Sequence, residues 1–376
     1  MDRPLRICYV IDNLAAAGTE KQLSRLLAGL DRAVVEPYLC LLDGSAESSR
    51  RLEPTDVSII RLGIDRLASW GALKAAARFV HFLRWKRIDI VQAYFIDSAL
   101  FAIPLARAAG IRSVLHVRNN AGYAHGLGLD RVDRICRYLT TLTITNSYVA
   151  RCEWIKRGIS AERIEVVANF LPGPAEHFHP PFQSAVPVVG IVANARPVKN
   201  LDGFLRMARS ATEAGIDARF RIAGDGSERS SLQEMATKMG IANSVVFDGT
   251  VNDVFTFLAG VDIAVLCSHS ESQSNAILEY LAAGKPILAT DVGCNREWVE
   301  DSGAGIVAPA GDDAALVCGL LGMLGNREIT CKMAIDGWNY YRTKRQSADP
   351  LYDWYRIYGI TAGGCRDATA GKARSA

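Results

Sequence analysis

Two glutamates flank a run of small polar residues at the end of a predicted buried strand. The apolar run 263–266 predicts that strand, and a helical pattern begins near Asn275. The first-turn N–H groups of a helix favour a phosphate, because they lack intrahelical partners and lie at the positive end of the helix dipole. Glu271 precedes this helix and Glu279 lies within it. Because carboxylates accept paired hydrogen bonds from vicinal hydroxyls, the stretch predicts a site for a phosphate-bearing sugar or nucleotide.

Small polar side chains line the same run and add hydrogen-bonding groups beside the predicted phosphate site; they are Ser272, Ser274 and Asn275. The pattern has a second interpretation. A surface helix with a capped N-terminus and two solvated glutamates would have the same spacing. Spacing alone leaves both interpretations open.

Two cations precede another predicted helix in the same half of the chain. Arg196 and Lys199 follow the predicted strand 188–193. Cations in such a loop stabilise the negative charge that develops on a pyrophosphate leaving group. The alternative is a pair of surface cations beside a helix start.

A glycine pair follows the predicted strand 219–223. Gly224 and Gly226 flank a single aspartate. Glycine adopts positive φ at little cost, so the pair predicts a tight turn that lies beside a nucleotide or is simply a turn.

Together these motifs resemble the nucleotide-sugar signature of retaining glycosyltransferases with the GT-B fold, glycosyltransferase family 4. The resemblance is densest over 190–299 and extends over most of the chain. Gln273 is a departure, because the family often has Phe there. The signature consists of Glu271 and Glu279 with seven intervening residues, the run Ala282-Ala283-Gly284-Lys285-Pro286, and the later Gly293 and Glu297.

The resemblance implies a role for each residue of the second half. Glu279 would hold the ribose hydroxyls, and Glu271 would orient the hydroxyls of the donor sugar. Lys199 and Arg196 would stabilise the departing pyrophosphate, together with the first-turn amides of the helix. The nucleotide would lie against Gly224, Gly226 and the loop that ends at Val251.

The first half contributes two further candidates through the same resemblance. Gly18 lies in a Gly-Thr-Glu turn that is similar to the family's Gly-Gly-Ala-Glu turn, with Ala17 in place of the first glycine. His116 lies where the family often places a histidine near the reacting sugar, although a histidine at a strand end is also commonly structural. The polar loop that follows would face acceptor hydroxyls, through Asn119, Asn120 and Tyr123.

Composition narrows the class of protein. The chain has 376 residues, 49% of them hydrophobic and 22% charged, as in an ordinary globular protein and unlike disordered or fibrous chains. A net charge of +3 does not indicate nucleic acid as a partner.

No run of about 18 apolar residues predicts a membrane span, and we expect a cytoplasmic protein with reduced cysteines. No Asp-x-Asp metal clamp is evident, so we expect no metal and no cofactor besides the donor substrate.

Strand-like and helix-like segments alternate through both halves of the chain. Such alternation predicts parallel sheets covered by helices, and here an α/β protein of two Rossmann-like domains. The resemblance implies that the domains face each other across a cleft. The predicted divisions are an acceptor-binding domain at 1–175, a proline-rich linker at 176–187, a nucleotide-sugar-binding domain at 188–345, a helix crossing back to the first domain at 346–360, and a flexible tail at 361–376.

The stretch 72–87 is basic and amphipathic. Such a helix could lie peripherally on an anionic membrane, at the inner face of the cytoplasmic membrane. We expect it mainly to pack on the sheet through Leu73, Ala77, Val80 and Leu83 or Arg84, with peripheral membrane contact as a secondary role.

The sequence thus predicts a retaining glycosyltransferase that uses a nucleoside diphosphate sugar, with a UDP-sugar favoured and a GDP-sugar next. The expected acceptor is a glycan or a lipid-linked intermediate of cell-envelope polysaccharide synthesis. Two alternatives stay open: a sugar-nucleotide epimerase with the same pair of domains, and a homologue that binds a nucleotide sugar without catalysis.

Overall fold

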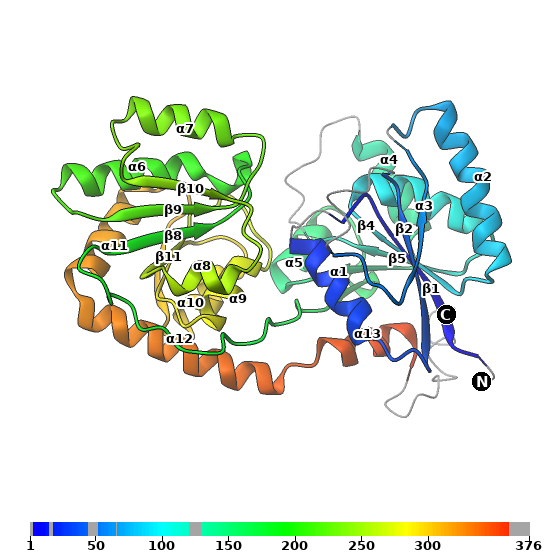
Figure 1. Cartoon of the computed structure of the whole chain (residues 1–376). Helices are drawn as coiled ribbons and strands as arrows, with labels where there is room; N and C mark the ends of the chain where they lie inside the picture. Colours follow the sequence, from blue (N-terminus) through cyan, green and yellow to red (C-terminus); the bar gives the residue numbers. More distant parts are fainter. Residues whose placement is uncertain (1–2, 15–17, 44–51, 65, 120–128, 361–376) are drawn as a thin grey trace. The chain divides into compact units, whose positions relative to one another are not determined.

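The computed structural model describes residues 3–14, 18–43, 52–64, 66–119 and 129–360, with the side chains of the helix at 129–139 described from Asp133 onward. The chain divides into two compact units (Figure 1). One unit holds the chain up to Phe170 and from Asp349 on, and the other holds Leu171–Ala348. The predicted tail 361–376 and two residues of the predicted acceptor loop, Asn120 and Tyr123, lie outside the described residues.

A seven-stranded parallel sheet forms the centre of the first unit, in the order β3-β2-β1-β4-β5-β6-β7. The inner strands β1, β4 and β5 are almost wholly buried, as expected of a parallel sheet covered on both faces, whereas the edge strand β3 is partly exposed. The strands are β1 (Leu5–Ile11), β2 (Val35–Leu41), β3 (Ser58–Arg61), β4 (Ile90–Tyr94), β5 (Ser113–Val117), β6 (Leu142–Thr145) and β7 (Ile164–Val166).

Helices cover both faces of this sheet because successive strand residues point to opposite sides. Ile7 and Ile11 share a core cluster with Trp354 of α13 and with the leucines of α1. Val10 shares another cluster with α2 and α3. The helices of the unit are α1 (Gly18–Gly29), α2 (Trp70–Trp85), α3 (Ile96–Ala108), α4 (Leu129–Leu139), α5 (Tyr148–Lys156), the 3-10 turn η2 (Ala161–Arg163) and α13 (Pro350–Tyr358).

A six-stranded parallel sheet forms the centre of the second unit, in the order β10-β9-β8-β11-β12-β13. Phe204 of α6 and Leu320 of α11 pack on one face, and Ile277 of α9 and Tyr341 of α12 pack on the other. The strands are β8 (Val188–Val192), β9 (Arg219–Ala223), β10 (Val245–Gly249), β11 (Ile263–Leu266), β12 (Ile287–Thr290) and β13 (Gly305–Ala308).

The helical elements of the second unit follow its strands in turn. They are the 3-10 turn η3 (Pro197–Lys199), α6 (Leu201–Glu213), α7 (Arg229–Lys238), α8 (Val254–Ala259), α9 (Asn275–Ala282), α10 (Asn295–Glu300), α11 (Asp313–Gly325) and α12 (Arg327–Ser347). The prediction of two Rossmann-like α/β units is confirmed. Sequence analysis missed α10 and α12.

The proline-rich segment that we predicted as a linker is bound to the second unit. The Phe182 N–H donates to Asp262 Oδ1 at 2.5 Å, and the Lys285 ammonium donates to the His179 carbonyl at 3.1 Å. Lys285 is fully buried, and burial lowers its pKa to about 8 although Asp262 opposes the shift. These contacts explain why the chain divides at Phe170 and Leu171, ahead of the proline-rich residues.

The last described helix, α13, belongs to the first unit, although α12 before it belongs to the second. Its Trp354 and Tyr358 enter the first unit's core. The Tyr358 hydroxyl lies 3.1 Å from the Tyr9 hydroxyl and donates to Gln92 Oε1 at 2.9 Å. A buried polar network therefore holds this helix against the sheet.

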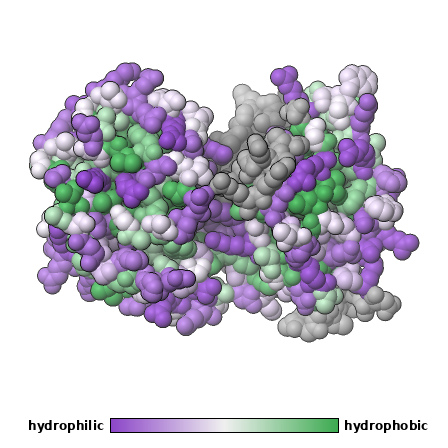
Figure 2. Space-filling model, in the orientation of Figure 1, coloured by the Kyte–Doolittle hydropathy of each residue, from purple (hydrophilic) through white to green (hydrophobic). Residues whose placement is uncertain are grey.

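Hydrophilic residues cover much of the face of each unit that is turned to the viewer, and hydrophobic residues show between them (Figure 2). No helix in the described ranges combines the length and the apolar character that crossing a bilayer requires.

Candidate functional site

The second sheet reverses its strand order between β8 and β11. The next strand in the sequence, β9, lies on one side of β8 in the sheet, and β11 lies on the other side. Parallel α/β sheets bind ligands outside the carboxyl ends of the strands at such a topological switch point. The loops after β8 and β11 carry Lys199 and Glu271, and the Lys199 Nζ to Glu271 Oε1 distance is 2.6 Å. The fold thus brings together two predicted site residues that are 72 positions apart.

Asn200 positions Lys199. Asn200 has a left-handed backbone with φ of 52° and begins α6, accepting from the Gly203 N–H at 3.2 Å. Its side-chain amide also donates to the Cys267 carbonyl at 3.1 Å. The His269 N–H donates to the Val198 carbonyl at 2.8 Å. The two loops are therefore fastened together by hydrogen bonds on both sides of the ion pair.

Glu271 is held by its own loop and by the loop after β12. The Ser268 hydroxyl donates to Glu271 Oε1 at 2.8 Å, and the Thr290 hydroxyl donates to the Ser268 carbonyl at 2.7 Å. Gly293 has φ of 59°, and a Cβ there would lie 2.4 Å from the Ser272 carbonyl oxygen. Only glycine allows this approach without a shift in the backbone. The side chains of Lys199 and Glu271 are 26% and 11% exposed, so a ligand can reach both.

Tyr280 fixes α9 beneath the switch point. Its hydroxyl accepts from the Val192 N–H at 2.8 Å and donates to the Val265 carbonyl at 3.0 Å, so one buried group joins α9 to the ends of both β8 and β11. Burial raises its pKa, which keeps the hydroxyl protonated. Sequence analysis missed Tyr280, because an aromatic residue on the apolar face of a helix carries no distinguishing signal.

The start of α9 follows Glu271 directly. Ser272 and Ser274 are buried, Asn275 is half-buried, and the Ser274 side chain makes no capping hydrogen bond to the first turn. Glu279, further along the helix, is only 4% exposed. The structure thus places these predicted residues on one loop and helix beside the Lys199 and Glu271 pair.

The glycine turn after β9 lies against the loop after β8. A Cβ on Gly224 would lie 2.0 Å from the Ala193 carbonyl oxygen, and one on Gly226 would lie 2.5 Å from the Ala195 carbonyl oxygen. Both glycines are therefore needed for backbone packing at the base of the loop that carries Arg196. Arg196 is exposed, and Val251 is half-buried in the core cluster that includes α8 and α9.

Gly18 and His116 belong to the first unit. Gly18 begins α1, and His116 is a buried residue of β5. Burial and, secondarily, Arg118 hold the pKa of His116 well below its usual value, although Asp133 opposes this. Within the described parts of the chain, His116 Nδ1 has no hydrogen-bond partner.

Arg118 is itself buried, and an ion pair and a ring hold it in place. Its guanidinium donates to Asp133 Oδ1 at 2.5 Å and stacks 4.3 Å from the Trp154 ring centroid. Asp133 also pairs with Arg137. Burial lowers the pKa of Arg118, and Asp133 counters that effect.

A small pocket opens at the carboxyl ends of the first sheet's strands. Tyr94 and Trp354 provide aromatic surface, and Gln22 and Asn119 provide amides. The Gln22 amide donates to the Phe170 carbonyl at 3.2 Å and accepts from its N–H at 2.7 Å, which fixes its orientation. Val117 lines the pocket, so the neighbouring His116 points to the opposite face of the sheet.

No cluster of three or more potential metal ligands occurs among the residues that the structure describes.

The fold and the site define a class: a protein of two Rossmann-like units with the GT-B fold. HepE from Anabaena, in its complex with UDP and glucose, shares this fold with a TM-score of 0.78 and 18% identity over 94% of this chain and 98% of that one. Residues 186–326 match the family described as "Glycosyl transferases group 1", and residues 17–170 match the "Glycosyl transferase 4-like domain". The chain belongs to the group 1 glycosyltransferases.

Two curated relatives come from Rhizobium meliloti. The lipopolysaccharide core biosynthesis glycosyltransferase LpsD is 24% identical over 333 residues, which are 87% of this chain and 90% of that protein. The lipopolysaccharide core biosynthesis glycosyltransferase LpsE is 30% identical over 116 residues, which are 31% of this chain and 34% of that protein. The match to LpsE therefore spans about a third of that relative's length.

Proposed function

We propose that this chain transfers a sugar from a nucleoside diphosphate sugar to a hydroxyl acceptor, with retention of the anomeric configuration. The observation that carries the proposal is the contact between Lys199 and Glu271 at the switch point of the second sheet, where Nζ and Oε1 lie 2.6 Å apart. A cation for a pyrophosphate and a carboxylate for sugar hydroxyls are thereby held at one place. A UDP-sugar is the favoured donor and a GDP-sugar the next, and the solved HepE complexes with UDP and with UDP-glucose support this order.

The residues of the second unit take the following roles. Lys199, with exposed Arg196 and the first-turn amides of α9, neutralises the charge that develops on the pyrophosphate. Glu271 accepts hydrogen bonds from the donor sugar, and Glu279 accepts them from the ribose. The backbone beside Gly224 and Gly226 and the loop ending at Val251 border the nucleotide.

The chemical step exchanges one bond to the anomeric carbon for another. The bond from that carbon to the pyrophosphate oxygen breaks, and the acceptor oxygen bonds to the same face. The acceptor proton passes to a phosphate oxygen of the donor. We expect the step to need no protein nucleophile and no metal, because the sequence offers no evident nucleophile and no Asp-x-Asp clamp, so positioning and electrostatics supply the rate enhancement. His116, kept neutral by its surroundings, is proposed to hydrogen-bond the reacting sugar.

The first unit is proposed to bind the acceptor, a glycan or a lipid-linked intermediate. The pocket at the carboxyl ends of its strands includes Asn119, whose amide can bind hydroxyls. The names of LpsD and LpsE place those relatives in lipopolysaccharide core biosynthesis, which supports a cell-envelope glycan as the acceptor class.

The test is a transfer assay with UDP-, GDP-, ADP- and dTDP-sugars, each with and without an added extract of membrane lipids and glycans. We expect release of one nucleoside diphosphate that depends on the acceptor and continues when magnesium is chelated. The coupling constant of the product's anomeric proton should show retention. An inverted product would contradict the stereochemistry, and a new sugar nucleotide formed without acceptor would indicate an epimerase instead.

A further inference from the structure

α2 presents an apolar surface to solvent. We expected Leu73 and Ala77 to pack on the sheet, and this was wrong. The residues that face the core are Ala72, Ala75, Phe79 and Leu83, of which only Leu83 was predicted. Leu73 is 62% exposed, and the tryptophans at the two ends of the helix, Trp70 and Trp85, are 84% and 67% exposed. The helix therefore has a second apolar side that the first unit does not cover.

Positive charge accompanies these apolar residues. No Asp or Glu occurs from Arg66 to Ile88, a segment that contains six Lys and Arg residues, whereas the whole chain carries a net charge of only +3. The exposed basic residues of this segment are Arg66, Lys74, Arg78, Arg84 and Arg87. The surface of α2 is thus both apolar and cationic.

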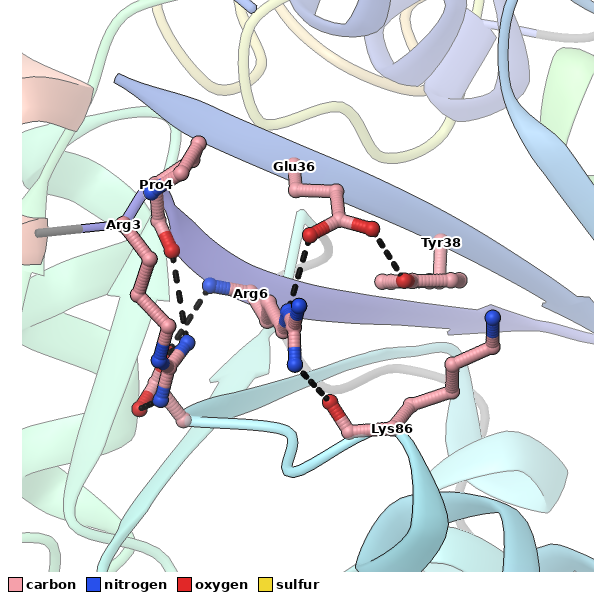
Figure 3. Close-up of polar contacts among 7 residues, drawn as sticks. Arg3, Pro4, Arg6, Glu36, Tyr38 and Lys86 are labelled. Carbon is pink, nitrogen blue, oxygen red and sulfur yellow. Dashed lines mark hydrogen bonds and ion pairs between the residues drawn. The ribbon is translucent and has the colours of Figure 1, made fainter. Parts of the chain in front are cut away.

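Fixed helix ends hold this surface in place. Ser69 caps the first turn by accepting from the Ala72 N–H at 3.1 Å. At the other end, Arg6 of β1 donates to the Lys86 carbonyl at 3.0 Å and to Glu36 at 2.8 Å, and the Tyr38 hydroxyl also donates to Glu36 (Figure 3). The Lys86 ammonium lies 4.4 Å from the centroid of the Trp85 ring. The exposed tryptophans therefore stand on a helix that is anchored at both ends.

We propose that the outer side of α2 is a docking surface for an anionic lipid bilayer. A helix that combines exposed tryptophans with basic residues lies in the plane of a membrane interface, with its apolar residues inserted and its cations beside anionic headgroups. Trp70 and Trp85 are separated by about 22 Å along the helix axis, at 1.5 Å per residue. Tryptophan prefers this interface because its ring is apolar and its N–H is polar.

The observations favour a bilayer over a protein or nucleic acid. A protein interface of the usual kind depletes its centre of charge, whereas Lys74 and Arg78 lie between the exposed apolar residues of α2. A single-stranded nucleic acid would account for the cations and, by base stacking, for the tryptophans, but not for exposed Leu73. The acidic headgroups and apolar acyl chains of one bilayer match both properties.

Flotation of the full chain with lipid vesicles tests the proposal. Vesicles of equal parts phosphatidylcholine and phosphatidylglycerol should carry the protein, and pure phosphatidylcholine vesicles should carry much less of it. Lys74→Gln with Arg78→Gln should lower the partition coefficient roughly thirtyfold, because each basic residue near an anionic surface contributes about fivefold. Trp70→Ala with Trp85→Ala should also weaken binding and should remove the blue shift of tryptophan fluorescence.

A matched control changes the same net charge on the second unit. Lys238→Gln with Arg209→Gln alters exposed residues of α7 and α6. This variant should float like the unaltered chain. Circular dichroism and thermal unfolding show whether each variant is folded before binding is compared.

Three results would overturn the proposal. The first is that the unaltered chain does not bind anionic vesicles. The second is that the α2 variants and the control variant lose binding equally. A concentration-dependent dimer that is lost in the tryptophan variant would show instead that a second copy covers α2. Because vesicle binding is measured without donor or acceptor, failure here leaves the proposed sugar transfer intact, and failure of transfer leaves this inference intact.

Discussion

The two sheets have equivalent switch points, but the side chains there differ. In the second unit, the loops after β8 and β11 hold Lys199 against Glu271. In the first unit, the order reverses between β1 and β4, and Asp12 after β1 accepts from both the N–H and the hydroxyl of Ser98, at 2.9 and 2.5 Å. Burial raises the pKa of Asp12. One switch point therefore carries a carboxylate paired with a cation, and the other carries a carboxylate that is hydrogen-bonded to the first turn of α3.

This difference shows that the fold provides the position and the loops provide the chemistry. The donor-binding role that we propose for the second unit follows from its side chains, because its topology at the switch point is shared with the first unit. Variants at the two switch points and in the elements around them therefore test whether the two sites differ in function.

Lys199→Ala should lower kcat/KM for transfer at least about a hundredfold, the usual effect of removing a group that stabilises developing charge. Steady-state kinetics with the preferred donor measures this. Lys238→Ala, which removes an exposed lysine of α7, is the matched control and should leave the rate unchanged. Equal rates in both variants would contradict the role of Lys199.

Gly293→Ala should destabilise the chain by about 2–4 kcal/mol, because it combines a strained positive φ with a clash against the Ser272 carbonyl. Gly215→Ala separates the two causes, since Gly215 has φ of 77° with no atom near its Cβ position. We expect that control to cost about 1 kcal/mol. Urea unfolding of the two variants measures the difference, and similar costs would mean that close approach at Gly293 is unimportant.

His116→Gln should make stability less sensitive to acid. The folded state lowers the pKa of His116, so below pH 6.5 the unfolded state binds more protons and stability falls as the pH falls. Below pH 6.5 the histidine contributes up to about 1.4 kcal/mol per pH unit to the pH dependence of the unfolding free energy. Well above pH 6.5 it contributes nothing to that dependence. Denaturant midpoints between pH 7 and pH 5 measure the slope. An unchanged slope in the variant would show that His116 does not titrate on unfolding in this range.

Asp12→Asn should leave nucleotide affinity unchanged, because an amide oxygen can still accept from Ser98 and no ligand contact is proposed there. Glu271→Gln, the equivalent change at the second switch point, should weaken donor-sugar binding. Isothermal titration with the donor compares the two. A loss of affinity in Asp12→Asn as large as in Glu271→Gln would remove the distinction between the switch points.

Sequence patterns predicted the alternation of strands and helices well, because buried parallel strands such as β8 and β11 are continuous apolar runs. The same patterns missed α12, whose buried stripe is Thr330, Ala334, Gly337 and Tyr341 and so has little aliphatic periodicity. They also misassigned part of α2, because two of its core-facing residues are the small Ala72 and Ala75, while the larger Leu73 is exposed to solvent.

For the candidate site, residue types and the family signature were sufficient to select Lys199 and Glu271, and the structure brings them together. The roles of these and the other site residues stay predictions. The supporting contacts of Asn200 and Tyr280 could not be predicted, because each depends on how two distant loops meet. The Pro-rich segment had the composition of a linker, and only its hydrogen bonds to Asp262 and Lys285 show that it is bound to the second unit.

The most direct test of the account is thermal-shift titration with UDP, GDP, ADP and dTDP, with and without magnesium, on the unaltered chain and on Glu279→Ala. We expect one nucleotide, with UDP the favoured one, to raise the unfolding temperature of the unaltered chain without magnesium. The same nucleotide should not raise the unfolding temperature of Glu279→Ala. No stabilisation by any nucleotide, or an equal shift in Glu279→Ala, would contradict a donor site at the second switch point.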